Sequence, residues 1–369
     1  MALEERQEIM RRIEAERNGR ALICYFNFDR DSNPPIPGLR TQFSSDTKEA
    51  LFRVLNETLT DQDKVDLCLY TRGGDTNAVW PIASLISEFD ADFEVLVPFR
   101  CHSGGTLLAL GSKKIVMTSL SELGPVDPST GNQFNPSDPA QPENRLAISV
   151  EDVQAYRSFI LDQFGIEDDN EPTLSREALT PFLDRLTEQV HPLALGNVHR
   201  VHQQIKKLAR KLLELHSVKA RNLDKVIDSL TTGFYSHLHA INRHEARDIL
   251  GEGHVEFASE QLSLLLDELL REYENNFSLR RSLFLREYLG EDAEKKALFA
   301  GGAVESKAWS YLYYTEVLCR QHSALPKNVQ VQLPPGQAMP LIAGLPREFE
   351  VDVTSQGWEH NTTPRGVTL

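Results

Sequence analysis

Short apolar runs alternate with amphipathic segments through the first third of this chain. Four such runs, each bounded by turn-forming residues, predict buried strands at 21–28, 65–70, 93–99 and 114–117. The segments 46–59 and 78–89 lie between them and are predicted to be helices, the second with its apolar residues on one face. Strands and helices that alternate at this spacing predict an α/β fold, with a parallel sheet covered by helices.

The rest of the chain is mostly helical in its periodicity. Residues 1–20 are predicted to form a polar helix, and the proline-rich stretch 125–145 a long loop. Further helices are predicted at 150–164, 175–189, 197–215, 261–275 and 294–317. Alternating residues predict short strands at 329–333 and 349–353. The apolar seam of segment 197–215 suits core packing and an oligomer contact equally well.

The composition disfavours several classes of protein. The 369 residues carry 39 Lys and Arg against 54 Asp and Glu, and this net charge of −15 argues against a general nucleic-acid binder. No stretch reaches the roughly 18 apolar residues of a transmembrane helix, and the charged N-terminus lacks the apolar core of a signal peptide. The four cysteines form no CxxC pair, so neither a disulfide framework nor a zinc–thiolate site is expected. We therefore expect a cytoplasmic protein without a membrane span.

Two glycine-containing turns follow two of the predicted strands, and each leads into a predicted helix. The first reads Thr-Arg-Gly-Gly-Asp at 71–75, and the second reads Cys-His-Ser-Gly-Gly-Thr at 101–106. Both lie at the carboxyl ends of strands, where open α/β sheets bind their ligands. Ser103 is thus placed near the N-terminus of an apolar helix, whose backbone N–H groups can hold an anion. Taken alone, each turn also fits a tight strand-to-helix connection in which Ser103 only caps the helix.

These turns resemble those of the serine dehydrogenase proteinase family, in the stretches LYTRGGDTNAVW (69–80) and RCHSGGTLLALGSKKIVMTSLSELGPVDPSTG (100–131). The family is related to signal peptide peptidase A and to the proteolytic subunit of the Clp protease. A third stretch, SHLHAINRHEARDILGEG (236–253), is similar to the hairpin and helix that close this fold, with Glu245, Ala246 and Gly251 at matching places. The resemblance implies a Clp protease/crotonase-like spiral of βαβ units.

The resemblance also implies how the chain is divided. A hydrolase domain is expected over about 21–255, with a helical insertion at about 150–225. The remainder is expected to form a helical extension at 256–324 and a Pro-rich tail with short strands at 325–369. Relatives with this fold generally assemble into rings or trimers, so a homo-oligomer is expected, and the C-terminal extension is a possible contact for a protein partner.

The family implies a role for particular residues of the two turns. Ser103 corresponds to the nucleophile, and the backbone N–H groups of Gly74 and Gly104 correspond to the oxyanion hole, which stabilises a tetrahedral intermediate. Asp127 and His237 would complete a triad in the family's order Ser, Asp, His, with the carboxylate orienting the imidazole. Further residues that could line the pocket are Gly73, Asp75, His102 and His239.

The base remains open between several residues. His237 and His239 alternate on a predicted strand, so they could also form a hydrogen-bonded pair or half of a metal site, although no third ligand is evident. Asp127 lies between two prolines and could be a turn residue. Signal peptide peptidases use a Ser/Lys dyad, for which this chain offers lysines on an amphipathic helix that otherwise form a solvated face: Lys206, Lys207 and Lys211.

Three functions are compatible with this pattern. The first is a serine peptidase-like hydrolase that cleaves peptide, ester or thioester bonds through an acyl-enzyme on Ser103, with no cofactor or metal. The second is a crotonase-like enzyme acting on an acyl-coenzyme A, in which Glu122 or Asp127 would be the acid/base. The third is a catalytically silent scaffold that binds a partner. The serine at 103 favours the first, because crotonase-like enzymes do not need it; the expected substrate is a peptide or protein.

Overall fold

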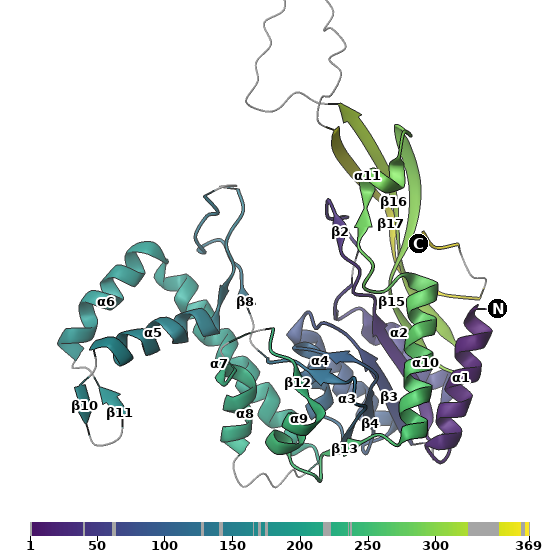
Figure 1. Ribbon diagram of the computed structural model, residues 1–369, viewed down its shortest axis with the longest axis horizontal. Helices are drawn as coiled ribbons and strands as arrows, with labels where there is room; N and C mark the ends of the chain where they lie inside the picture. Colours follow the sequence, from purple (N-terminus) through teal and green to yellow (C-terminus); the bar gives the residue numbers. More distant parts are fainter. Residues whose placement is uncertain are drawn as a thin grey trace, which may run out of the picture.

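An eight-stranded sheet forms the centre of the molecule in the computed structural model (Figure 1). The structure describes residues 2–39, 41–60, 64–126, 129–139, 143–164, 166–168, 171–173, 176–216, 223–234, 236, 238–323, 347–362 and 366–368. Across the sheet the strand order is β13-β6-β4-β3-β1-β15-β16-β17. The first five are parallel: β13 (Val255–Phe257), β6 (Lys114–Met117), β4 (Glu94–Val97), β3 (Val65–Tyr70) and β1 (Ala21–Asn27). The predicted parallel sheet is therefore confirmed.

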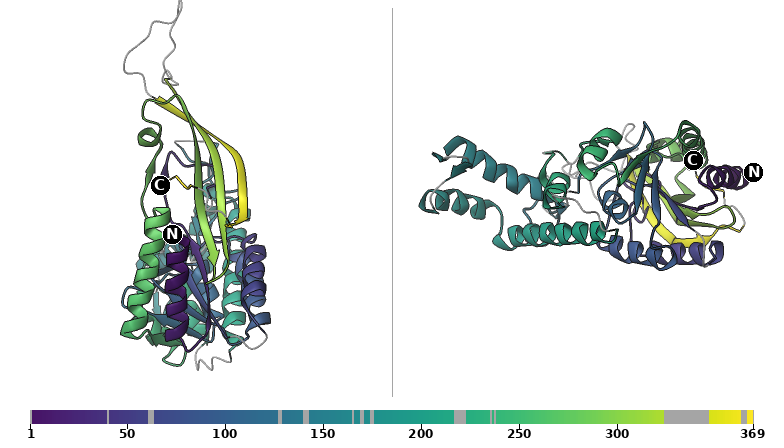
Figure 2. Two further views of the ribbon diagram at one scale, coloured as in Figure 1. Left: turned by 90° about the vertical axis from the view of Figure 1, so that its right-hand side faces the viewer. Right: turned by 90° about the horizontal axis from the view of Figure 1, so that it is seen from below.

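Three long antiparallel strands extend this sheet at the side of β1, and they project beyond α1 and α10 (Figures 1 and 2). They are β15 (Glu294–Glu305), β16 (Ser310–Ser323) and β17 (Arg347–His360). The helix predicted at 294–317 is therefore wrong, because this segment pairs with the free side of β1, and its run of tyrosines and β-branched residues suits a strand. The strand predicted at 349–353 is confirmed within β17, whereas 329–333 lies outside the described residues.

Helices cover both faces of the sheet. One face packs against α2 (Thr47–Thr58), α3 (Val79–Phe89), α4 (Gly104–Leu110), α7 (Pro192–Glu214), α8 (Leu223–Thr232) and α9 (Arg243–Leu250). The other face packs against α1 (Ala2–Glu16) and α10 (Glu260–Phe277). Both faces of β1 are buried, with Ile23 and Tyr25 on the first and Leu22 and Phe26 on the second, which explains its continuous apolar sequence.

Small sheets and short helices complete the fold. A three-stranded sheet joins β5 (Arg100–Cys101), β7 (Glu122–Leu123) and β12 (Ile241–Asn242). The two-stranded pairs are β2 (Ser32–Asn33) with β14 (Leu283–Phe284), β8 (Ser129–Thr130) with β9 (Ile148–Ser149), and β10 (Ile166–Asp168) with β11 (Glu171–Thr173). The short helices are η1 (Thr76–Ala78) and α11 (Leu285–Leu289). Among the described segments, no helix combines the length and apolar character that crossing a membrane requires.

A helical arm leaves the body of the molecule between β9 and α7 (Figures 1 and 2). It consists of α5 (Val150–Phe164), the β10–β11 hairpin and α6 (Arg176–Gln189), so the helices predicted at 150–164 and 175–189 are confirmed. In α7, the buried side chains Ile205, Ala209 and Leu212 belong to the core of the body. Of the two interpretations of its apolar seam, the structure thus supports core packing for this half of the helix.

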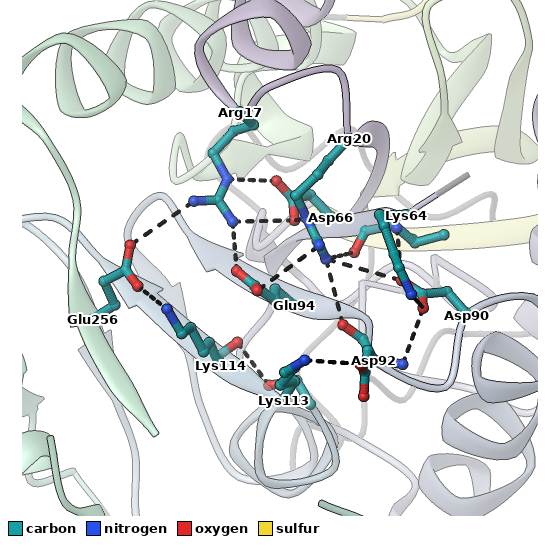
Figure 3. Close-up of polar contacts among 12 residues, drawn as sticks. Arg17, Arg20, Lys64, Asp66, Asp90, Asp92, Glu94, Lys113, Lys114 and Glu256 are labelled. Atoms are coloured by element: carbon teal, nitrogen blue, oxygen red, sulfur yellow. Dashed lines mark hydrogen bonds and ion pairs between the residues drawn. The ribbon is translucent and has the colours of Figure 1, made fainter. Parts of the chain in front are cut away.

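An ion network closes the amino edge of the parallel strands (Figure 3). Arg17 lies 2.6 Å from Asp66 on β3 and 2.5 Å from Glu94 on β4, and Arg20 also lies 2.5 Å from Asp66. Asp66 is fully buried, so these two guanidinium groups compensate a charge that would otherwise be costly. The network ties the turn after α1 to the starts of two strands, at the end of the sheet opposite the glycine turns.

Candidate active site

The two glycine turns lie side by side at the carboxyl ends of β3 and β5. The Thr71 N–H donates to the Arg100 carbonyl at 2.9 Å, and the His102 N–H donates to the Thr71 carbonyl at 3.0 Å. A Cβ added to Gly73 would lie only 2.7 Å from the Ser103 Cβ, which shows how closely the first turn approaches the serine. The structure therefore brings Gly73, Gly74, Ser103 and Gly104 together.

Ser103 has an unusual backbone conformation, with φ 51° and ψ −110°. Positive φ is uncommon for a residue other than glycine, and it persists where the surrounding structure enforces it. Although Ser103 precedes α4, its side chain makes no capping hydrogen bond with that helix. The interpretation of Ser103 as a simple helix cap is therefore wrong, and its hydroxyl is not used to terminate the helix.

The first turn requires glycine for two reasons. Gly73 and Gly74 have φ values of +101° and +145°, which L side chains rarely adopt. The Gly73 carbonyl accepts from the Phe43 N–H at 2.8 Å, and the Asp75 N–H donates to the Phe43 carbonyl at 2.9 Å. The Gly73 carbonyl and the Gly74 N–H belong to one planar trans peptide unit, so the N–H of Gly74 points away from Phe43.

Two backbone N–H groups beside Ser103 are available to a ligand. A Cβ built on Gly104 would lie 3.8 Å from the Gly74 nitrogen, so these two residues are close neighbours. Within the described part of the chain, neither the Gly74 N–H nor the Gly104 N–H donates a hydrogen bond. A pair of uncommitted N–H groups next to a serine is the arrangement that stabilises an oxyanion.

Asp75 and His102, both predicted as possible pocket residues, contact other parts of the protein. The Asp75 carboxylate accepts from the Asn77 N–H at 2.9 Å and so caps η1. The His102 Nε2 lies 3.1 Å from a Glu122 carboxylate oxygen, while its Cβ packs close to Gly124. Burial lowers the pKa of His102, although the neighbouring Glu122 charge opposes this effect. His102 is thus held between β5 and β7.

His239 forms an acid–base pair with Glu245. Its Nε2 lies 3.1 Å from both carboxylate oxygens, and its ring stacks on Phe234 with 4.5 Å between centroids. His239 lies in a turn and not on the strand predicted for it, because its N–H bonds to the Ser236 carbonyl and pairing begins only at Ile241. The Glu245 carboxylate as a partner of this imidazole was not predicted from the sequence.

Strand register places His239 and Ser103 toward the same end of the three-stranded sheet β12-β7-β5. In the three-stranded sheet, Cys101 and Ile241 both pair with Leu123, from its two sides. Ser103 follows Cys101 by two residues, and His239 precedes Ile241 by two residues on an antiparallel strand. The register therefore places Ser103 and His239 at the same end of the three-stranded sheet.

The remaining candidates for the base fall into two groups. Asp127 and His237 lie outside the described residues. Of the lysines, Lys206 is paired with Asp228, and the Lys211 ammonium lies 3.2 Å from the centre of the Trp80 ring, while Lys207 is exposed. The described lysines thus contact α8 and α3 or solvent. Within the described residues, no three His, Cys, Asp or Glu side chains are placed to hold a metal ion.

The part of the chain that contains the two glycine turns matches a known protein family. Residues 1–153 match the family of ClpP-like SDH-type serine proteinases. This match confirms the resemblance predicted from the two turns and the Clp-protease-like α/β fold, and it supports a serine peptidase-like function. The family match ends at residue 153, so it includes the candidate nucleophile, the oxyanion hole and Asp127, but neither His237 nor His239 and only the first turn of α5.

Two curated relatives come from Methanocaldococcus jannaschii. The uncharacterized protein MJ0137 is 31% identical over 147 residues, which cover 40% of this chain and 51% of the relative. The uncharacterized protein MJ1495 is 32% identical over 127 residues, which cover 34% of this chain and 42% of the relative. The matches thus cover about half or less of these relatives.

Solved structures of two mutants of the 1510-N membrane-bound stomatin-specific protease also align with this chain. One is 17% identical, covers 63% of this chain and 80% of its own, and has a TM-score of 0.31. The other, in complex with a substrate peptide, is 16% identical, covers 68% and 81%, and has a TM-score of 0.30.

Proposed function

We propose that this protein is a serine peptidase-like hydrolase that acts through an acyl-enzyme on Ser103. The supporting observation is the close approach of Ser103 to two backbone N–H groups, those of Gly74 and Gly104, that have no acceptor among the described residues. The serine oxygen would attack the substrate carbonyl, and the two N–H groups would bind the oxygen that becomes negative. Both donors are fixed by the backbone before the reaction begins.

A histidine is proposed as the general base. The family resemblance favours His237, oriented by Asp127. The described pair His239–Glu245 supplies a second candidate with the same division of roles, because Glu245 contacts Nε2 and leaves Nδ1 to accept the serine proton. In either case the imidazole would next protonate the leaving group, and water activated by the same ring would hydrolyse the acyl-enzyme.

The crotonase-like alternative receives less support from the site. Its carboxylate acid would be Glu122 or Asp127, and Glu122 already contacts Arg100 at 3.3 Å and His102 at 3.1 Å. Ser103 would also have no role in that chemistry, although its backbone is held in a strained conformation. We therefore retain the peptidase-like proposal, with a peptide or protein substrate, a cytoplasmic location and a homo-oligomeric state as its further parts.

Active-site labelling with a fluorophosphonate probe tests the proposal. Wild-type protein should be labelled, Ser103→Ala should not be, and Ser87→Ala, a half-buried serine of α3, should behave as wild type. Labelling that is equal in wild type and Ser103→Ala would refute Ser103 as the nucleophile. Labelling of His237→Ala and His239→Ala in parallel distinguishes the two candidate bases. Removal of the histidine that acts as the base should reduce the labelling rate at least about 100-fold.

A further inference from the structure

The arm exposes large apolar side chains to solvent. Phe159 on α5 is 56% exposed, Phe164 at the end of α5 is 54% exposed, and Leu183 on α6 is 56% exposed. Phe164 lies between Phe159 and Phe182, with ring centroids at 6.4 Å and 5.4 Å. A cluster of exposed aromatic and leucine side chains on a soluble protein marks a surface that binds a partner.

The arm is also strongly acidic. Between residues 150 and 189 the chain carries three arginines and ten acidic residues: Glu151, Asp152, Asp162, Glu167, Asp168, Asp169, Glu171, Glu177, Asp184 and Glu188. The resulting charge of 3 − 10 = −7 is almost half of the net −15 of the whole chain. An apolar surface on a segment with this net charge favours a partner that is cationic and apolar, and it repels anionic membranes and nucleic acid.

A cavity lies at the base of the arm. Its volume is about 620 Å³, which is enough for a few side chains. It is lined by Asn132, Gln133, Phe134, Leu193, Gly196, Asn197 and Arg200. Phe134 and Leu193 remain 36% and 56% exposed there, so the cavity offers apolar contacts next to the first turns of α7.

Helix α7 connects this cavity with the candidate active site. The Gln204 side chain donates to the Asn77 side chain at 2.7 Å, and Asn77 follows Gly74 by three residues. From Asn197 to Gln204 the helix rises about 10 Å, which an extended polypeptide spans with about three residues. A chain bound in the cavity therefore lies within a few residues of the oxyanion turn.

We propose that the arm and the cavity at its base form a docking surface for cationic, apolar segments of a polypeptide substrate. The exposed Phe159, Phe164 and Leu183 would take the apolar side chains, and the acidic residues of the arm segment would attract the Lys and Arg residues. The delivery of the bound segment to Ser103 rests on the proposed function, whereas the docking itself does not.

Binding measurements on the full-length Ser103→Ala protein test the docking surface without catalysis. The probe is a fluorescein-labelled 20-residue peptide of alternating leucine and lysine, followed by fluorescence anisotropy. The double substitution Phe159→Ser/Leu183→Ser should weaken its binding at least tenfold. Phe52→Ser, which removes a ring that is 47% exposed on α2, should leave the affinity unchanged. A leucine/glutamate peptide should not bind, and higher salt should weaken the leucine/lysine peptide.

Two results would overturn the inference. One is equal affinity of the arm variant and the Phe52→Ser control for the leucine/lysine peptide. The other is an arm variant whose mass in analytical ultracentrifugation falls while its peptide affinity is unchanged, which would assign the arm to contacts between copies of the chain. When the same arm substitutions are made in the protein that retains Ser103, fluorophosphonate labelling should match wild type. A failure of catalysis can therefore be distinguished from a failure of docking.

Discussion

Replacing Gly73 with alanine tests whether the two turns form one site. The new Cβ would lie 2.7 Å from the Ser103 Cβ, about 1 Å closer than the optimum separation of carbon atoms. The φ of +101° adds backbone strain of about 1–2 kcal/mol for an L residue. Overpacking adds about 1–3 kcal/mol, so we expect Gly73→Ala to lower the free energy of unfolding by roughly 2–5 kcal/mol.

The same substitution should slow the reaction of Ser103. Relief of the contact requires Ser103 or the turn to move by about 1 Å, and a displacement of that size costs on the order of 100-fold in rate. The rate of fluorophosphonate labelling measures this effect, and urea denaturation measures the stability. Labelling is followed under conditions in which both proteins remain folded.

Gly253→Ala is the matched control. Gly253 precedes β13, at the end of the sheet opposite the glycine turns, and a Cβ added there meets no heavy atom within 4 Å. We expect labelling within a few-fold of wild type. If Gly73→Ala is labelled as fast as Gly253→Ala, the close approach of the first turn to Ser103 has no part in the chemistry and the reasoning fails.

Two further predictions concern buried charges away from the site. Arg6 and Glu305 form a buried ion pair at 2.7 Å, so Arg6→Ala should cost about 3–5 kcal/mol in urea denaturation, and the double variant Arg6→Met/Glu305→Gln should recover more than half of that loss. Burial lowers the pKa of His254 to about 4, below its usual 6.5, so the unfolded chain binds a proton first as the pH falls. This histidine should therefore remove about 2 kcal/mol of stability between pH 7 and pH 5, and a pH dependence that is unchanged in His254→Gln would contradict that assignment.

The parallel part of the sheet could be predicted because its strands are buried on both faces. The bounds predicted for β3 and β6 agree with the structure, since an apolar run with polar ends contains all the information for such a strand. The helix predicted at 294–317 is wrong because the periodicity of this segment is ambiguous and its partner, β1, lies some 280 residues earlier in the chain. Pairing over that separation is a tertiary effect that overrides local propensity.

The candidate site also contains features that the local sequence predicts and one contact that it does not. The approach of Gly73 to Ser103 follows from two turns at the ends of neighbouring parallel strands, and each turn can be recognised locally. The His239–Glu245 contact depends on the path of the chain from β12 into α9. Asn242 caps α9 and Glu245 is its third helical residue, so the sequence carries a capping-box pattern. That pattern predicts the start of the helix, but it does not reveal that the carboxylate contacts His239.

The conformation of Ser103 is enforced by the core beneath it. All seven residues of α4 are buried, so the helix has little freedom to shift and relieve the strain at its first turn. The Thr106 hydroxyl lies 2.8 Å from both the Cys101 and the Gly124 carbonyl oxygens and can donate its proton to either, which links the chain on both sides of the serine to the end of β7. Strain of this kind persists only where packing over-determines it. The buried helix thus explains how a serine outside any regular element keeps this uncommon backbone conformation beside Gly73 and Gly104.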